Sequence, residues 1–277
     1  MADRMARDDA RKSGGGRNPS ASAPDGSSRM AYGGKTVYGA TVGMLMLETS
    51  FPRIPGDLGH APTWPVPVLF KVVSGATPER LNDQRESKLL DLFVKAGKEL
   101  VAQGADGLTT SCGFLSLYQD RLKAECGVPV AASSLLQVPL VEALLPPGKR
   151  CGVVTISRNI LRPEHLEAAG CAPDTPVQGC EAGEEFVHIA RRPVDVLDVA
   201  KAEADVLNAG AELVRRHPEV GAIVMECTNM PPYAAALRNH VGLPVFNIYT
   251  LVSWFQAGLR PRQFGHPSSA PLPFRER

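Results

Sequence analysis

Two segments of the chain, more than 100 residues apart, share one order of features. Cys112 ends an apolar run and is followed 15 residues later by GVPV, and Cys227 ends another run and is followed 15 residues later by GLPV. Further upstream, VGMLMLE at 42–48 in the first half corresponds to CGVVTIS at 151–157 in the second. These matches in one register predict an internal duplication, with two similar lobes related by a pseudo-two-fold axis.

Within each half, β-branched and apolar runs alternate with segments whose apolar residues recur at helical spacing. The clearest helices are predicted over 87–104, which ends on a glycine, and over 198–218. Strands that alternate with helices are typical of a parallel α/β fold. The other strands are predicted at 36–47, 67–75, 105–111, 128–134, 150–157, 221–226 and 243–250, and the other helices at 113–127, 135–148, 161–170, 230–242 and 251–259.

The predicted fold class is therefore α/β, with two similar lobes whose parallel sheets are flanked by helices and whose active site lies in the cleft between them. The first lobe is predicted to comprise 35–133 plus 245–262, and the second lobe 134–244. Residues 1–34 are rich in Gly, Ser, Pro and Arg and are predicted to be a disordered extension without a catalytic role. Residues 263–277 form a C-terminal tail, and either Met1 or Met30 can be the start of translation.

Composition and charge exclude several classes of function. The 277 residues carry a formal net charge of +1, which provides no field to attract nucleic acid or an acidic membrane surface. No apolar run reaches the length of a transmembrane helix. The six cysteines form no CxxC motif and have no histidine at ligand spacing, so no metal site is predicted. A chain of this kind without a secretory signal is expected to be cytoplasmic, with reduced thiols.

The positions of Cys112 and Cys227 predict a chemical role. In open α/β sheets, ligands bind beyond the carboxyl ends of the strands, where both cysteines stand, each just before a predicted helix. The N-terminus of a helix is expected to lower the pKa of a thiol. Two such thiols on opposite walls of a cleft can remove a proton from one face of a carbon and return it on the other.

A proton α to a carboxylate is weakly acidic, so the cleft must also stabilise the enediolate-like charge that develops. The backbone N–H groups of Gly113, Phe114, Thr228 and Asn229 are suitably placed donors, and Thr228 or Asn229 could cap the helix that follows. The remaining candidates for the substrate site are Asp57, Ser111, Ser133 and Thr155, all near predicted strand ends. An aspartate in the position of Asp57 is more often a turn residue than a ligand, and a helix cap explains Ser133 equally well.

The cysteine motifs resemble those of the aspartate/glutamate racemase superfamily, over about residues 36 to 260. The segment ECTNMPPY at 226–233 is similar to the second-cysteine motif of that family. The resemblance implies that Cys227 is one catalytic thiol, that Thr228 contacts the substrate carboxylate, and that Cys112 in TSC is the other thiol. The two-thiol chemistry itself predicts a small carboxylate as substrate and needs no cofactor.

The sequence departs from the amino-acid racemases directly after the first cysteine. The family's amino-acid racemases have Asn-Thr at this point, whereas this chain has Gly113 and Phe114. This change, together with ECT…PPY and PGD at 55–57, resembles the branch that includes the algal dimethylsulfoniopropionate lyases. Those enzymes abstract an α-proton and then expel a β-leaving group, so abstraction of the α-proton is the shared prediction.

The sequence therefore leaves several functions open. A cofactor-independent racemase or epimerase is placed first, and a β-eliminating lyase of the dimethylsulfoniopropionate type second. Cation–π contacts from Phe114, Trp64 and Tyr233 to a methylated cation would favour the lyase. A two-lobed binding protein is the third hypothesis, and a pair of buried core cysteines the simplest structural explanation. A homo-oligomer is compatible with the sequence.

Overall fold

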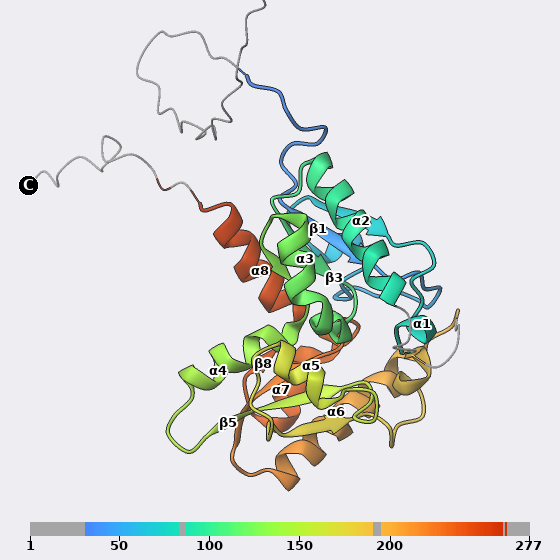
Figure 1. Cartoon of the computed structure of the whole chain (residues 1–277). Helices are drawn as coiled ribbons and strands as arrows, with labels where there is room; N and C mark the ends of the chain where they lie inside the picture. The colour runs from blue at the N-terminus through green and yellow to red at the C-terminus, as the bar shows by residue number, and fades with distance from the viewer. Residues whose placement is uncertain (1–30, 83–86, 191–194, 263, 265–277) are drawn as a thin grey trace, which may run out of the picture. The chain divides into compact units, whose positions relative to one another are not determined.

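The computed structural model describes residues 31–82, 87–190, 195–262 and 264. The chain divides into two units, Met1–Gly34 and Lys35–Arg277, and the description below concerns the second unit (Figure 1). Nearly all of the predicted N-terminal extension and of the C-terminal tail lies outside the described residues. No helix in the described part of the chain is both long and apolar enough to cross a membrane.

The first half of this unit forms a four-stranded parallel sheet with the order β2-β1-β3-β4. Val42 of the central strand β1 pairs with Val68 of β2 on one side and with Gly107 of β3 on the other. Strand β1 is buried along its whole length because helices cover both faces of the sheet. The strands are β1 (Val42–Met46), β2 (Val68–Val72), β3 (Gly107–Thr110) and β4 (Val130–Ala131).

The second half repeats this arrangement in another four-stranded parallel sheet with the order β6-β5-β7-β8. The strands are β5 (Arg150–Thr155), β6 (Val177–Gly179), β7 (Val220–Met225) and β8 (Val245–Phe246). Each strand of the second sheet therefore has a counterpart at the same place in the first, and β7 corresponds to β3. The predicted α/β fold with two similar parallel sheets is confirmed.

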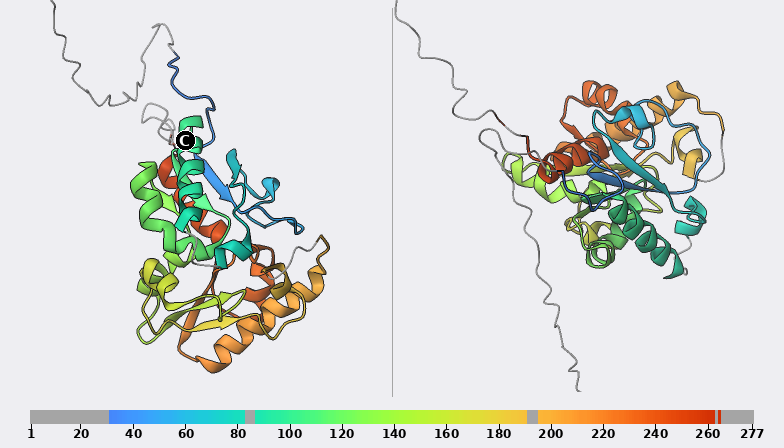
Figure 2. Two further views of the ribbon diagram at one scale, coloured as in Figure 1. Left: turned by 45° about the vertical axis from the view of Figure 1, so that its right-hand side comes forward. Right: turned by 90° about the horizontal axis from the view of Figure 1, so that it is seen from above.

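Helices pack on both sheets. In the first half, α2 and α3 cover one face of the sheet, and α8 covers the other, where Ile248 and Val252 pack against Val42 and Met44 (Figures 1 and 2). The α-helices are α1 (Pro78–Asn82), α2 (Ser87–Gln103), α3 (Gln119–Cys126), α4 (Val138–Leu144), α5 (Pro163–Ala168), α6 (Val199–Arg216), α7 (Ala234–Val241) and α8 (Ile248–Leu259). The 3-10 helices are η1 (Ala61–Thr63), η2 (Gly113–Tyr118), η3 (Ser134–Gln137), η4 (Phe186–Ala190) and η5 (Pro231–Tyr233).

The duplication extends to backbone detail. Tyr118 and Tyr233, which end η2 and η5, both have a φ of −97° and each leads into an eight-residue helix. These helices, α3 and α7, end at Gly127 and Gly242, whose φ angles of 68° and 72° lie in the left-handed region that favours glycine. The glycines begin the GVPV and GLPV segments, so the sequence match reflects a repeated turn from helix to strand.

The limits of several predicted elements differ from the structure. The strand predicted at 36–47 begins only at Val42, where the neighbouring strands β2 and β3 begin to pair with it. The strand predicted at 243–250 is reduced to β8, because the Asn247 side chain accepts hydrogen bonds from two backbone N–H groups and starts α8. The helices predicted at 113–127 and 230–242 each begin with a 3-10 segment. Because β8 pairs with β7, a lobe boundary drawn by sheet membership falls after Phe246.

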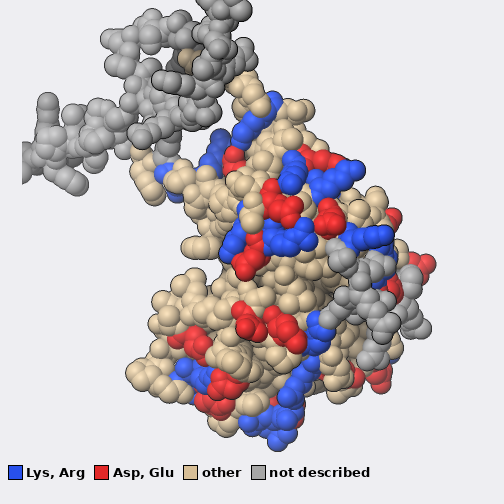
Figure 3. Space-filling view, in the orientation of Figure 1, with Lys and Arg blue, Asp and Glu red and all other residues tan. Residues whose placement is uncertain are grey.

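Charged side chains of both signs are interspersed over the face of the molecule seen in Figure 3. This distribution agrees with the formal net charge of +1. It gives this face no extended single-sign surface of the kind that tracks a nucleic-acid backbone.

Candidate active site

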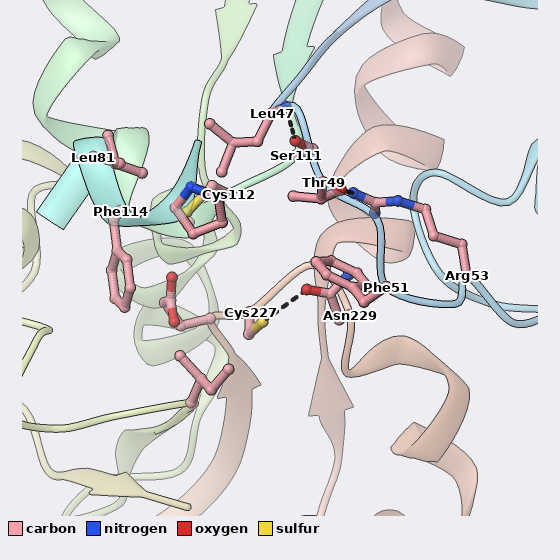
Figure 4. A pocket seen from close by; sticks show the side chains of 14 residues that line it. Leu47, Thr49, Phe51, Arg53, Leu81, Ser111, Cys112, Phe114, Cys227 and Asn229 are labelled. Carbon is pink, nitrogen blue, oxygen red and sulfur yellow. Dashed lines mark hydrogen bonds between the residues drawn. The ribbon is translucent and has the colours of Figure 1, made fainter. Parts of the chain in front are cut away.

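Cys112 and Cys227 occupy equivalent positions beyond the two sheets. Strand β3 ends at Thr110 and β7 ends at Met225, so each cysteine is the second residue after its strand. Both strands lie inside their sheets, where the carboxyl ends of parallel strands commonly form a ligand site. Both cysteines line a single pocket between the two halves, which Cys112 enters from the first and Cys227 from the second (Figure 4).

Buried hydrogen bonds hold the two cysteine-bearing segments in place, one of them between the two halves. The Thr228 hydroxyl donates to the backbone carbonyl of Ser111 at 2.7 Å, next to Cys112. The Ser134 hydroxyl donates to the carbonyls of Met225 and Glu226 at 2.7 and 3.0 Å. All of these groups are buried, so the bonds hold the walls of the pocket at a defined separation.

The sulfur of Cys112 faces backbone donors. The N–H groups of Phe114 and Leu115, at the start of η2, favour its thiolate and so lower the pKa of this thiol. Loss of water around the sulfur and the nearby Glu226 charge act more strongly in the other direction, and together they raise the pKa to about 12. Cys112 therefore rests as a neutral thiol at pH 7.

Cys227 belongs to a chain of polar contacts that continues through Asn229 and Asp57 to Arg53. Its thiol donates to Asn229 Oδ1 at 3.5 Å, and Asn229 Nδ2 donates to Asp57 Oδ2 at 2.5 Å. Asp57 in turn forms an ion pair with Arg53 at 2.7 Å. Burial, followed by the Glu226 charge, raises the pKa of the Cys227 thiol well above its usual value. Asn229 is thus held by Asp57 with its oxygen toward the thiol.

Two sequence-based expectations about these segments are wrong. The thiol pKa values were expected to be lowered by helix N-termini, but desolvation outweighs the backbone donors at both cysteines. Neither Thr228 nor Asn229 caps the following helix, because η5 begins after Met230, without a side-chain cap. The two side chains instead bond to Ser111 and Asp57.

The structure brings six of the ten predicted site residues to the pocket wall: Ser111, Cys112, Gly113, Phe114, Cys227 and Asn229. The other four lie behind the wall. Asp57 holds Arg53 and Asn229, Thr155 bonds to Glu226, and Thr228 bonds to Ser111. Ser133 caps η3 by accepting a hydrogen bond from the N–H of Leu135 at 3.2 Å.

Of the three aromatic residues expected to favour a cation, only Phe114 lines the pocket. Trp64 is buried, stacks on Tyr249 and donates its indole N–H to the carbonyl of Leu58. Tyr233 is also buried and packs edge-on against Phe186. Core packing therefore explains Trp64 and Tyr233.

Sequence reasoning missed further lining residues. Glu226, directly before Cys227, is 1% exposed, and burial raises the pKa of its carboxyl to about 7. Arg53 brings a positive charge to the wall and lies over the Phe51 ring at 4.7 Å (Figure 4). A charged residue beside a strand-end cysteine was a visible signal for Glu226, whereas nothing in the loop sequence FPRIPGD identifies Arg53. Thr49 was a weaker candidate in the sequence, and the other missed lining residues are Leu47, Phe51, Pro78, Leu81 and Ile156.

Comparison with curated proteins gives one kind of relative. The chain is 26% identical over 227 residues to a dimethylsulfoniopropionate lyase of Durusdinium sp. clade D, which covers 79% of this chain and 75% of that protein. It is 29% identical over 230 residues to dimethylsulfoniopropionate lyase 7 of Emiliania huxleyi (strain CCMP1516), which covers 79% and 67%. No protein-family model matches this sequence.

Solved structures share the fold at low sequence identity. A mutant of arylmalonate decarboxylase in a sulfate-associated form superposes with a TM-score of 0.55 at 15% identity, over 79% of this chain and 92% of that one. The glutamate racemase RacE1 of Bacillus anthracis gives a TM-score of 0.51 at 14% identity, over 79% and 82%. The resemblance seen in the cysteine motifs is thereby confirmed: the chain has the two-lobed fold of the aspartate/glutamate racemase superfamily, and its curated relatives are dimethylsulfoniopropionate lyases.

Proposed function

We propose that the protein is a β-eliminating lyase that cleaves a sulfonium propionate of the dimethylsulfoniopropionate type to a dialkyl sulfide and acrylate. The observation that carries the proposal is the pair of strand-end cysteines on one pocket. The names of the curated relatives support elimination over racemisation, which the sequence alone placed first. Gly113 and Phe114 also support elimination over racemisation, because they replace the Asn-Thr pair that the resemblance implies for amino-acid racemases.

The reaction begins with removal of the proton next to the carboxylate. One cysteine, as a thiolate, takes this proton, and the electron pair of the C–H bond forms the carbon–carbon double bond. The bond between the β-carbon and sulfur breaks with its electron pair on sulfur, which leaves as a neutral sulfide. The new thiol later returns its proton to water, so one substrate gives one sulfide, one acrylate and one proton.

The walls of the pocket suit both ends of such a substrate. Arg53 supplies a positive charge for the carboxylate. The apolar side chains of Leu81, Phe114 and Ile156 suit the methyl groups of a sulfonium, and an aromatic face attracts a methylated cation. The N–H groups of Phe114 and Leu115 stabilise a Cys112 thiolate when it forms.

No cofactor is part of this proposal. Within the described ranges, no three His, Cys, Asp or Glu side chains are grouped so as to hold a metal ion. The absence of a cofactor stays a prediction, and dialysis against a chelator checks it. Activity that disappears on dialysis and returns with a divalent ion would contradict it.

A racemase or epimerase remains the second candidate, because two thiols on one pocket also suit proton exchange between two faces of a carbon. The test incubates the purified protein with dimethylsulfoniopropionate and measures dimethyl sulfide in the headspace by gas chromatography. In parallel, aspartate, glutamate and other carboxylates are incubated in deuterated water, and exchange of the α-proton is followed by NMR. Sulfide release supports the lyase. Exchange with inversion and without sulfide release supports the racemase. If the protein shows neither activity, both candidate functions are refuted.

A further inference from the structure

Glu226 is a carboxyl residue of the pocket to which neither the sequence pattern nor the proposed reaction assigns a role. It follows β7 directly, is 1% exposed, and lines the same pocket as Cys112 and Cys227. A carboxyl group so far removed from water is costly unless it is protonated or paired with a positive charge. Its position in the pocket therefore requires an explanation.

Hydrogen bonding leaves one oxygen of this carboxyl available. The Thr155 hydroxyl donates to Glu226 Oε2 at 2.7 Å, and the described residues contain no other hydrogen-bond partner of this side chain. The other oxygen, Oε1, lies against the Cα of Gly113. A Cβ at position 113 would lie 2.7 Å from the carboxyl carbon of Glu226 and closer still to Oε1, so glycine is what admits the carboxyl beside Cys112.

Electrostatics favours the neutral form of Glu226 during the reaction. A charge on Glu226 is the second-largest cause, after burial, of the raised thiol pKa at both Cys112 and Cys227. An ionised Glu226 would oppose the thiolate and also the negative charge that grows on the substrate carboxylate as the α-proton leaves. The protonated acid removes this repulsion and adds a hydrogen-bond donor.

The other titratable groups near Glu226 do not supply such a hydrogen-bond donor. Cys180, directly after β6, is buried, and burial, followed by nearby carboxylates including Glu226, raises the pKa of its thiol well above its usual value. Arg53 lines the same pocket and attracts the substrate carboxylate by its charge, but its Nη1 already donates to Asp57 at 2.7 Å and its Nη2 to Thr49 at 3.0 Å.

We propose that Glu226, as a neutral carboxylic acid, donates a hydrogen bond to the substrate carboxylate and stabilises the enediolate-like charge that forms there. The inference rests on the proposed α-proton abstraction and applies equally to elimination and to racemisation. Glu226 is then a catalytic residue of the site, alongside the two thiols. Thr155 is a positioning residue, because its hydroxyl occupies Oε2 and leaves Oε1 to carry the donated proton.

The binding test uses propionate, a carboxylate that cannot eliminate, and measures its affinity by calorimetry between pH 5.5 and 9 at constant ionic strength. The wild-type affinity is expected to fall about tenfold per pH unit above pH 7, as Glu226 loses its proton. Glu226→Gln keeps an N–H donor but cannot ionise, so its affinity is expected not to change over this range. Glu142→Gln, which removes a half-buried carboxylate that does not line the pocket, should retain the wild-type profile.

The catalytic test measures kcat for sulfide release, or for α-proton exchange if no sulfide forms. Glu226→Leu removes the donor and is expected to lower kcat by about 10² to 10³, as loss of an oxyanion donor does, while Glu226→Gln retains most of the activity. Wild-type affinity that rises above pH 7 would overturn the proposal, because a group that binds propionate as a neutral acid must bind it more weakly once it is ionised. A falling wild-type profile that persists in Glu226→Gln would overturn it as well. Propionate binding is measured without turnover, so it tests the role of Glu226 even if the protein does not catalyse the proposed reaction.

Discussion

The contact between Gly113 and Glu226 allows a sharp test of how the pocket is built. In Gly113→Ala, the new Cβ would lie 2.5 Å from the backbone carbonyl oxygen of Glu226. A real Cβ essentially never approaches another heavy atom more closely than 3.0 Å, so the two segments must separate by at least 0.5 Å. Because this contact is to the backbone, no rotation of the Glu226 side chain can relieve it.

The separation has a cost in stability and in activity. The hydrogen bond from Thr228 to Ser111 resists the movement, because it joins the two halves of the molecule. Overpacking of this kind typically costs about 1–3 kcal/mol of folding free energy. A shift on the order of 1 Å at a catalytic group can lower turnover by about 100-fold. Gly113→Ala is therefore expected to be folded but less stable, and strongly impaired.

The assay combines thermal unfolding, followed by circular dichroism, with sulfide release from dimethylsulfoniopropionate. Gly258→Ala is the matched control, because Gly258 lies in α8 and a Cβ there would meet nothing within 4 Å. The control is expected to be more stable by about 0.5–1 kcal/mol, as for alanine over glycine inside a helix, and fully active. Wild-type activity and an unchanged melting temperature in Gly113→Ala would refute the close packing of Gly113 on Glu226.

Three more predictions concern the same site. Of Cys112→Ser and Cys227→Ser, one should abolish sulfide release and the other slow it by about 10² to 10⁴, and full activity in both would leave the thiols without a role. Thr228→Val should lower the free energy of unfolding by about 1–3 kcal/mol in urea titrations, whereas Thr228→Ser keeps the hydrogen bond to Ser111 and should lose less. Equal losses in the two variants would show that this hydrogen bond does not stabilise the fold. Burial raises the pKa of Glu226 from 4.5 to about 7, so its contribution to stability is present below pH 4.5 and lost as the pH rises through 7. At about 1.4 kcal/mol per pH unit, Glu226→Gln should gain about 3 kcal/mol relative to the wild type between pH 4.5 and 8, and parallel stability curves would contradict this.

Much of the fold was predictable because it depends on local patterns. The apolar runs that became β1 and β7, and the amphipathic spacing that became α2 and α6, are properties of short segments. The limits of β8 were not predictable from strand propensity, because the capping by Asn247 overrides the β-branched residues that follow it.

The two cysteines were predictable for a different reason, since the duplication supplied two examples of one position. The residues that hold the neighbours of these cysteines come from elsewhere in the chain and have no local signature. Asp57 and Asn229 are 172 residues apart, and Thr155 and Glu226 are 71 residues apart. The raised thiol pKa values also depend on burial, which is a property of the assembled fold.

The duplication is close in backbone but not in chemistry, and this difference is consistent with the elimination that we propose. Ser111 precedes the first cysteine, whereas Glu226 precedes the second, and Gly113 stands where the second half has Thr228. Racemisation requires that both thiols exchange a proton with the same carbon, so matched surroundings would serve it. Elimination needs one base and different assistance on the other side. A pocket with two equivalent thiols but unlike neighbours therefore suits the proposed elimination, in which one thiol is the base and the other side of the pocket assists.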